Sequence, residues 1–174
     1  GHEALLHAAR ERAESVIATL FLNPTQFGEN EDLARYPADR ERDLTIMRSA
    51  GVDAVFVPSV DEMYPPGDAF TFNPGPIGDV LEGAQRPGHF RAVATVVAKL
   101  FNATRPDLAY FGEKDAQQLE VVRRMARDLR FGIEVIPVET VRDENGVALS
   151  SRLAFLSENE RVAAEIVYPS LCSA

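Results

Sequence analysis

The chain has 174 residues, of which 45% are hydrophobic and 26% charged, values typical of one soluble globular domain with a real core. A formal net charge of -9 without a long basic run argues against nucleic acid as the main partner. No apolar stretch approaches bilayer length, and the single cysteine, Cys172, permits no internal disulfide. We therefore expect a cytoplasmic protein that binds neither nucleic acid nor a membrane.

Apolar, strand-like runs alternate with helical patterns along the chain. Residues 2–15 predict a helix, and the β-branched run of residues 15–22 predicts a strand buried on both faces. Further helices are predicted over residues 39–50, 90–101 and 115–130 and from Ser157, and further strands over residues 52–59, 108–111 and 133–138. This order predicts right-handed βαβ units and an α/β fold with a doubly wound parallel sheet.

Short local signals mark turns and helix ends. Gly51 follows the second helix as a C′ residue, Asn145-Gly146 predicts a turn, and the spacing of Ser157 and Glu160 fits a capping box. The segment of residues 60–88 is too long, and too rich in Pro and Gly, to be a simple connection between two elements. Loops of that length are usually functional or disordered.

The stretch from Gly112 to Gln118 lies where the third strand passes into a helix. Gly112 permits a tight turn, and Asp115 can cap the helix, whose N-terminus favours an anion. Lys114 adds a mobile positive charge, and Gln118 follows one helical turn later on the same side. Because ligands of parallel sheets bind beyond the carboxyl ends of the strands, these residues are candidates for a binding site. A capped helix with a solvated lysine is the alternative.

Two further polar pairs have both a functional and a local interpretation. Asn23 and Gln26 directly follow the first strand, where their amides can fix a carboxylate or a hydroxyl, or form no more than an Asn-Pro turn. Arg86 and His89 precede the helix at 90–101, where a helix cap with a surface arginine is as good an explanation as a ligand site.

Two other groups suit phosphate. Ser150, Ser151 and Arg152 offer two hydroxyls and a guanidinium after the Asn-Gly turn, although a polar loop would look the same. Gly1 and His2 open the chain at a helix start, where a glycine allows close approach and an imidazole can donate to phosphate. A cloning remnant is the alternative for an N-terminal Gly-His.

Taken together and in order, these segments resemble one known family. The stretches "FLNPTQFGENEDLARYP", "RPGHFRAVATVVAKLFN", "PDLAYFGEKDAQQLEVVRRMARDL" and "ALSSR" are similar to the pantothenate synthetase (pantoate–β-alanine ligase) family. The resemblance covers nearly the whole chain, and "YFGEKDAQQ" is highly specific. It implies a Rossmann-like domain of the HIGH-motif nucleotidyltransferase superfamily, the adenylyltransferase type.

The resemblance implies a two-step ligase reaction. The carboxylate of pantoate attacks the α-phosphate of ATP, which gives pantoyl adenylate and pyrophosphate. The amine of β-alanine then attacks the acyl carbon, and AMP leaves. The family also implies Mg²⁺ with ATP and a homodimer.

The resemblance assigns a role to each candidate residue. The ATP-binding positions are Gly1, His2, Gly112, Glu113, Lys114, Asp115, Val141, Leu149, Ser150, Ser151 and Arg152. Of these, His2, Lys114 and Arg152 are the expected catalytic residues, and Asp115 is the expected metal ligand. The pantoate-binding positions are Asn23, Gln26, Arg86, His89 and Gln118, and Gln26 is also the β-alanine position.

The chain also departs from the family pattern. It begins at the second histidine of a His-x-x-His signature, so the family's first strand and first histidine are expected to be missing. Residues 1–156 then correspond to the Rossmann-like domain, and residues 157–174 to the start of a C-terminal lid domain that is largely absent. Leu153 takes a position that is usually asparagine in the family.

Two alternatives to a pantoate-activating ligase remain open at this point. One is a truncated domain that binds ATP or pantoate without turning over either. The other is a different adenylyltransferase of the same superfamily. The glutamines Gln26 and Gln118 favour pantoate over the latter, because a nucleotide-type acceptor would need cations at those positions.

Overall fold

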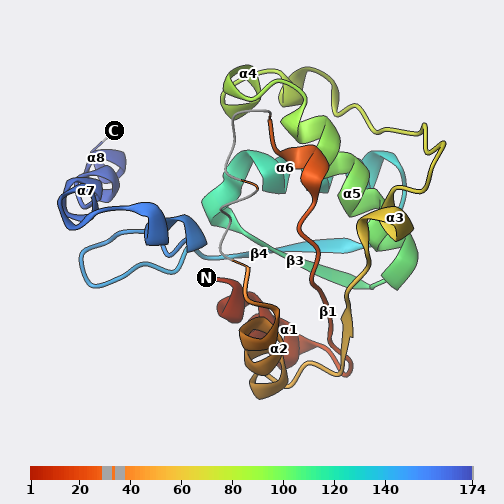
Figure 1. Cartoon of the computed structure of the whole chain (residues 1–174), viewed down its shortest axis with the longest axis horizontal. Coiled ribbons are helices and arrows are strands. Elements are labelled where there is room, and N and C mark those ends of the chain that lie inside the picture. Colours follow the sequence, from red (N-terminus) through yellow and green to blue (C-terminus); the bar gives the residue numbers. More distant parts are fainter. Residues whose placement is uncertain (29–32, 34–37, 174) are drawn as a thin grey trace.

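The computed structural model describes residues 1–28, 33 and 38–173, which form an α/β structure with parallel strands (Figure 1). Strand β1 (Ile17–Thr19) pairs with β2 (Ala54–Phe56), and β3 (Leu108–Gly112) pairs with β4 (Glu134–Val138); both pairs are parallel. The predicted α/β class with parallel strands is therefore confirmed.

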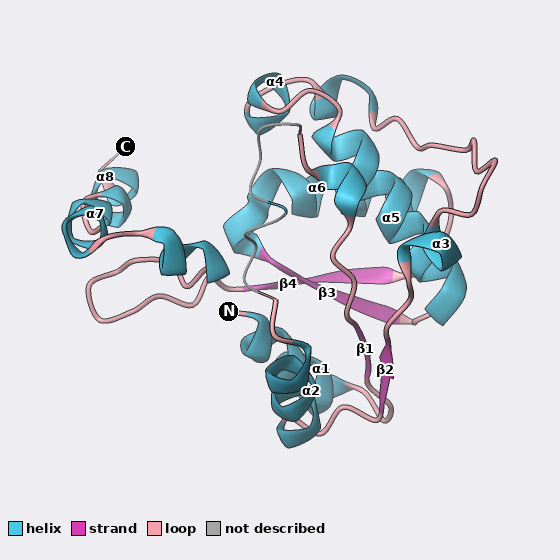
Figure 2. Cartoon of the chain, in the orientation of Figure 1, coloured by secondary structure: helices cyan, strands magenta, loops and turns pink. Residues whose placement is uncertain are grey.

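Helices connect and cover the strands (Figure 2). The α-helices are α1 (His2–Arg12), α2 (Arg40–Ser49), α3 (Val60–Met63), α4 (Glu82–Gln85), α5 (His89–Thr104), α6 (Ala116–Asp128), α7 (Glu158–Ala164) and α8 (Val167–Cys172). Short 3₁₀ helices are η1 (Pro24–Gln26), η3 (Gly75–Gly78), η4 (Glu113–Asp115) and η5 (Ser151–Phe155). The predicted elements are found, with bounds that differ by a few residues. Gly51 has a φ of +76° after α2, and the capping box of Ser157 and Glu160 is present.

The strands of the described residues form two separate two-stranded sheets rather than one continuous sheet. No backbone ladder within residues 1–28 and 38–173 joins β1 to β3. Ile17 of β1 is 50% exposed, so the prediction that this strand is buried on both faces is wrong. An apolar run indicates a capacity for burial, and only packing against other elements realises it.

The core lies between the helix pair α5–α6 and the sheet of β3 and β4. Phe90, Val121 and Val122 are at most 1% exposed. The ring of Phe101 meets the rings of Phe111 and Phe131 edge to face, with centroids 6.4 Å and 5.7 Å apart. Figure 1 shows α1 and α2 on the opposite side of β3 and β4. Helices thus flank this sheet on both faces, as a doubly wound arrangement requires.

The long segment of residues 60–88 is an ordered connection with three short helices, α3, η3 and α4. It is fastened to α5 by polar contacts: the Phe72 amide donates to Oγ1 of the buried Thr95 at 2.9 Å, and Lys99 Nζ donates to the Met63 carbonyl at 2.7 Å. This packing holds the segment beside α5 and leads the chain to Arg86 and His89.

The C-terminal part extends away from the rest of the molecule (Figure 1). The predicted turn at Asn145-Gly146 closes a hairpin, in which Arg142 and Ala148 form an antiparallel bridge. Asn145 Nδ2 donates to Oε1 of Glu165, which directly follows α7, at 2.7 Å. The Arg142 guanidinium lies 3.8 Å from the centroid of the Tyr168 ring in α8. These contacts cross the predicted boundary at residues 156 and 157, which stays a prediction.

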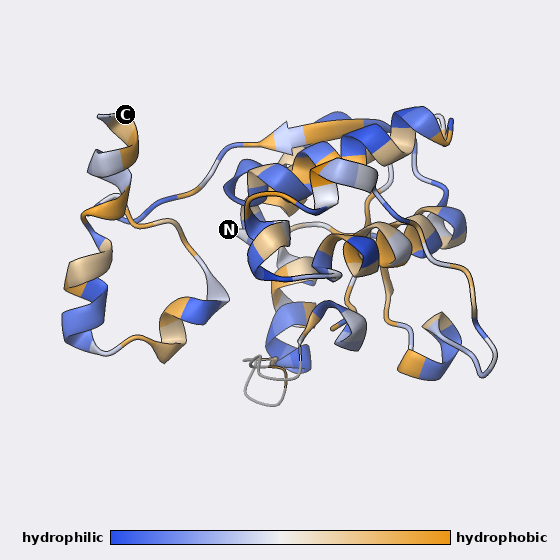
Figure 3. Ribbon diagram, turned by 90° about the horizontal axis from the view of Figure 1, so that it is seen from above, coloured by the Kyte–Doolittle hydropathy of each residue, from blue (hydrophilic) through white to orange (hydrophobic). Residues whose placement is uncertain are grey.

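Helices α7 and α8 contain no buried residue. The apolar side chains of residues 158–172 include Val162, Ile166 and Leu171, which are 62%, 69% and 65% exposed. Figure 3 shows hydrophobic stretches on the helices near the C-terminus, which stand apart from the rest of the ribbon. Among the described residues, none of the helices has both the length and the apolar character needed to cross a membrane.

One exposed ion pair joins α1 to the start of β2. Asp53 accepts from the Val16 amide at 2.8 Å and from Arg10 at 2.8 Å, and these contacts lower the pKa of Asp53. A carboxyl with a lowered pKa stabilises the fold above its unfolded pKa of about 3.9, and this contribution is lost as pH falls through the folded value.

Asp53→Asn should therefore lower the urea midpoint at pH 7, and the difference from the parent should shrink toward zero near pH 2. Urea unfolding at both pH values measures this. Asp61→Asn is the matched control, because Asp61 is exposed and has no hydrogen bond within the described part of the chain. An equal loss at both pH values would contradict the linkage.

Candidate functional site

The loop after β1 holds a buried amide with an unused donor. Asn23 is 2% exposed and caps η1, which agrees with the Asn-Pro turn that the sequence predicts as one alternative. Its Oδ1 accepts from the Thr25 amide at 3.3 Å, the Thr25 hydroxyl at 2.9 Å and the Tyr64 hydroxyl at 3.0 Å. These three donors fix the orientation of the amide. Asn23 Nδ2 is buried and has no hydrogen-bond partner among the described residues. A buried donor without an acceptor is unfavourable, and a ligand oxygen would satisfy it.

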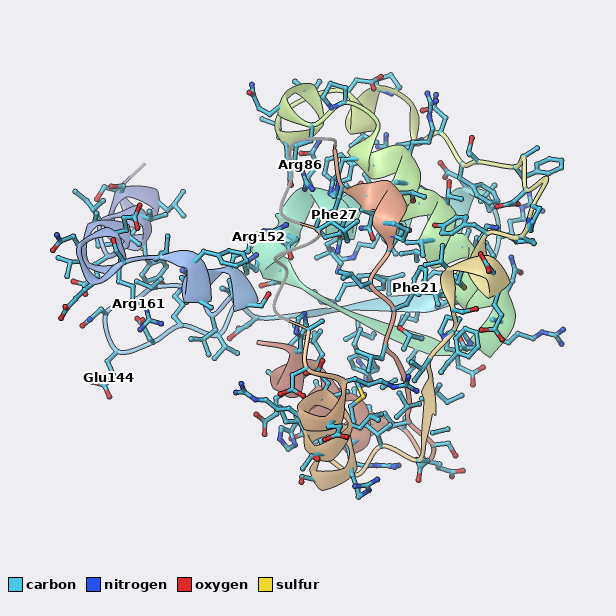
Figure 4. All side chains as sticks on the ribbon, in the orientation of Figure 1. Phe21, Phe27, Arg86, Glu144, Arg152 and Arg161 are labelled. Atoms are coloured by element: carbon cyan, nitrogen blue, oxygen red, sulfur yellow. The ribbon has the colours of Figure 1, made fainter. Side chains whose placement is uncertain are left out.

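Arg86 and His89 hold the backbone of Gln26 (Figure 4 labels Arg86). The Gln26 carbonyl accepts from Arg86 Nη2 at 3.2 Å and lies 3.1 Å from His89 Nδ1. Arg86 Nη1 lies 3.0 Å from His89 Nε2 and donates to Glu82 Oε1 at 2.8 Å. A neutral imidazole with its proton on Nδ1 satisfies both contacts of His89. The geometry therefore gives these two residues a supporting contact with Gln26, and their direct contact with pantoate stays a prediction.

The side chain of Gln26 is left available by this arrangement. Only its backbone atoms take part in hydrogen bonds within the described part of the chain. Gln26 is half-buried, so its amide can reach a ligand without first breaking a protein contact.

The junction of β3 and α6 differs from the prediction in two details. Gly112 has an extended backbone with φ of -74°, so it does not form the predicted tight turn. Nothing lies within 4 Å of where its Cβ would be, which leaves room beside this position. Asp115 precedes α6, but its carboxylate does not cap the helix because it pairs with Lys114 Nζ at 2.9 Å. The ammonium group is part-exposed and mobile enough to exchange this partner for a phosphate.

The two adjacent glutamines of α6 have different environments. Gln117 Nε2 donates to the Ile77 carbonyl at 2.8 Å and to the Val80 carbonyl at 2.7 Å. Its Oε1 accepts from the Glu82 amide at 3.1 Å. The Gln118 side chain makes no hydrogen bond with any residue that the structure describes. Of the two amides, Gln118 is thus the one available to a substrate.

The start of the chain meets the loop after the hairpin. A Cβ at Gly1 would lie 3.3 Å from the carbonyl oxygen of Leu149, so this glycine permits close approach. The Leu149 amide donates to the Val141 carbonyl at 2.9 Å. Ser150 caps η5 by accepting from the Arg152 amide at 3.3 Å. The structure thus brings together Gly1, Val141 and Leu149, three of the residues predicted to bind ATP.

The remaining predicted residues lie at the edges of these groups. His2 is the first residue of α1 and is exposed, Glu113 is in η4, and Ser151 and Arg152 are in η5. Figure 4 shows Arg152 at the root of the C-terminal extension. The individual ligand roles stay predictions.

Three residues of the site were not predicted from the sequence. Glu82 pairs with Arg86 at the i, i+4 spacing of a helical ion pair, which is a weak signal that could have indicated it. Gln117 is adjacent to Gln118, but neighbouring residues of a helix point in different directions. Tyr64 is 41 residues from Asn23, and no sequence pattern relates the two.

The strands are parallel and flanked by helices, and polar loops follow the carboxyl ends of β1 and β3. This arrangement places the chain in the Rossmann-like class of α/β proteins. The family model described as Pantoate-beta-alanine ligase matches residues 1–174. The chain belongs to this pantoate–β-alanine ligase family.

Known proteins agree with this assignment. The chain is 55% identical over 175 residues to the pantothenate synthetase of Chloroflexus aurantiacus, covering 100% of this chain and 62% of that protein. A crystal structure of pantothenate synthetase from Thermus thermophilus superposes with a TM-score of 0.96 at 54% identity, over 99% of this chain and 63% of that one. The chain thus spans about three fifths of the length of the relatives that it matches.

A third similar protein was solved with ligands. The pantoate-beta-alanine ligase of Francisella tularensis, complexed with Beta-gamma ATP and beta-alanine, has a TM-score of 0.92 at 36% identity. The match covers 97% of this chain and 65% of that one.

Proposed function

We propose that this chain supplies the ATP- and pantoate-binding part of a ligase that condenses pantoate with β-alanine through pantoyl adenylate. The observation that carries the proposal is the unused hydrogen-bonding capacity after two parallel strands. Asn23 and Gln26 follow β1, Gln118 follows β3, and their side-chain amides keep donors without partners among the described residues. Amide donors of this kind match the carboxylate and hydroxyls of pantoate.

The first chemical step is the attack of a carboxylate oxygen of pantoate on the α-phosphorus of ATP, with departure of pyrophosphate. Such a step requires aligned reactants and positive charge around the phosphates rather than covalent help from the protein. Lys114, His2 and Arg152 are the groups that we assign to this charge. In this role, the Lys114 ammonium group leaves the Asp115 carboxylate and binds phosphate. The close approach of Gly1 to Leu149 brings the start of α1, where His2 lies, to the loop that contains Arg152.

The second step is the attack of the β-alanine amine on the acyl carbon, after which the amine loses a proton and AMP leaves. Gln26 is the residue that we assign to orienting this amine. The backbone of Gln26 is fixed by Arg86 and His89, so its side chain starts from a defined position. A fixed position lowers the entropic cost of aligning the reactants.

Mg²⁺ bound to ATP is part of the proposal. Asp115 supplies one carboxylate next to the predicted phosphate site, and Mg²⁺ typically binds one or two carboxylates together with substrate phosphates. The described residues contain no group of three His, Cys, Asp or Glu that could hold a metal ion. When bound, the ion would neutralise phosphate charge. A homodimer and a cytoplasmic location complete the proposal, and the family resemblance supports both.

Exchange of labelled pyrophosphate into ATP tests the proposed function. We expect exchange only when pantoate is present, because pyrophosphate can return to ATP only through pantoyl adenylate. Exchange without pantoate, or only with a different adenylyl acceptor, would contradict the proposal and favour another adenylyltransferase. Binding of ATP and pantoate by calorimetry without any exchange would instead favour a binding domain.

A further inference from the structure

Gln117 links the two loops that carry the substrate amides. Its side chain uses all of its polar atoms on the backbone of residues 77–82: it donates to the Ile77 and Val80 carbonyls and accepts from the Glu82 amide. A side chain that satisfies three backbone groups at distances of 2.7–3.1 Å fixes the position of that segment relative to α6.

The contacts continue from Glu82 to the loop after β1. Glu82 Oε1 accepts from Arg86 at 2.8 Å, and Arg86 donates in turn to the Gln26 carbonyl at 3.2 Å. His89 contributes a second contact with the same carbonyl at 3.1 Å. The path therefore runs from the start of α6, next to Gln118, to η1, which contains Gln26.

This path matters because the two strands that lead to these loops do not pair with each other. Within the described residues, β1 pairs only with β2, and β3 pairs only with β4. The contacts through residues 77–89 therefore connect the two strand ends by a route that does not run through a backbone ladder. The segment carries local backbone strain, since Leu81 has a φ of +50°. Strained backbone persists where surrounding contacts determine it.

We propose that Gln117 is a positioning residue that sets the distance between the Gln118 and Gln26 amides by holding the segment of residues 77–89. It does not touch substrate in this role. The functional consequence rests on the proposed ligase activity, whereas the structural coupling does not. Loss of the Gln117 contacts should loosen the loop after β1, although Gln26 in that loop is 91 residues away in sequence.

The test compares Gln117→Met with the parent in the purified protein. Methionine has a similar volume but replaces the amide with a thioether, so it removes the three hydrogen bonds with little change in packing. Gln85→Met is the matched control, because Gln85 is an exposed glutamine of α4 whose side chain has no hydrogen bond within the described residues.

Hydrogen–deuterium exchange by mass spectrometry is the first measurement. Exchange of peptides covering residues 77–89 and 23–28 should each become at least about 5–10-fold faster in Gln117→Met, since the loss of even one of the three hydrogen bonds is expected to have this effect. Exchange should be unchanged in Gln85→Met. Faster exchange at residues 77–89 with parental exchange at residues 23–28 would overturn the coupling. No change in either peptide would overturn the role of Gln117 altogether.

Steady-state kinetics are the second measurement. The apparent KM for pantoate should rise about 10-fold in Gln117→Met, while the KM for ATP stays within about 2-fold, because the predicted phosphate contacts lie outside residues 77–89. Equal increases in both KM values would overturn the positioning role. If the parent shows no pantoate-dependent turnover, the proposed function fails, and the exchange data alone decide the coupling.

A second variant keeps the test decisive if Gln117→Met does not fold. Gln117→Glu retains an acceptor for the Glu82 amide but loses both donors to the Ile77 and Val80 carbonyls. Because its carboxylate also repels the two carbonyl oxygens, exchange at residues 77–89 should be faster than in the parent. Exchange no faster than the parent's would overturn the proposal.

Discussion

Lys114→Ala should slow pantoate-dependent pyrophosphate exchange by about 10²–10³-fold, the loss typical of one preorganised charge-stabilising donor. Lys114 lies at the strand-to-helix junction with only Asp115 as its partner among the described residues. In the adenylation step, charge is redistributed over the phosphates, and the ammonium group stabilises that charge. In the second step pyrophosphate has already left, so supplied pantoyl adenylate should react with β-alanine at close to the parental rate.

Measuring the two half-reactions separately checks this expectation. Arg123→Ala is the control, because Arg123 is an exposed cation of α6 that lies two helical turns beyond the helix start. It should leave both rates near those of the parent. Equal losses in both half-reactions of Lys114→Ala would instead mean that Lys114 supports the structure of the helix start.

Gln118→Ala should raise the apparent Kd or KM for pantoate about 10–100-fold and leave that for ATP nearly unchanged. An amide that bonds a buried carboxylate or hydroxyl contributes about 1–3 kcal/mol when it alone is removed. Because the Gln118 side chain has no hydrogen bond to the described residues, its loss should cost little stability. Pantoate titration at saturating ATP, together with thermal unfolding, measures both effects.

Gln85→Ala is the matched control for Gln118→Ala, since it removes an exposed glutamine amide elsewhere on the surface. It should change neither the pantoate affinity nor the unfolding temperature. A parental pantoate affinity in Gln118→Ala would exclude this amide from the pantoate site. A large fall in unfolding temperature would show that it has a structural role.

Local patterns were sufficient to predict the elements that form the core. The long helices α5 and α6 each carry a continuous apolar face, which includes Phe90 and Val122, and such periodicity directly reports burial. The capping box of Ser157 and the C′ position of Gly51 depend on residues close in sequence, and both were predicted for that reason.

The contacts of the site required the folded structure. Arg86 meets Gln26 across 60 residues, and nothing in either local stretch indicates the partner. Asp115 was expected to cap α6, but the neighbouring ammonium of Lys114 competes successfully for its carboxylate. Gly112 was expected to turn tightly, but an extended glycine has no distinguishing sequence pattern. The choice between Gln117 and Gln118 likewise depends on where residues 77–82 pack.

The contacts of Gln117 have an evolutionary consequence, because they involve only main-chain atoms of residues 77–82. Main-chain atoms are common to all residues, so Val80 and Leu81, which are 50% and 77% exposed, are free to drift without loss of these bonds. Leu81 should drift first, toward Gly, since glycine adopts its φ of +50° and ψ of -120° most readily. Related lineages should therefore differ in the residues at positions 80 and 81 while the segment keeps its shape, provided that an amide remains at position 117.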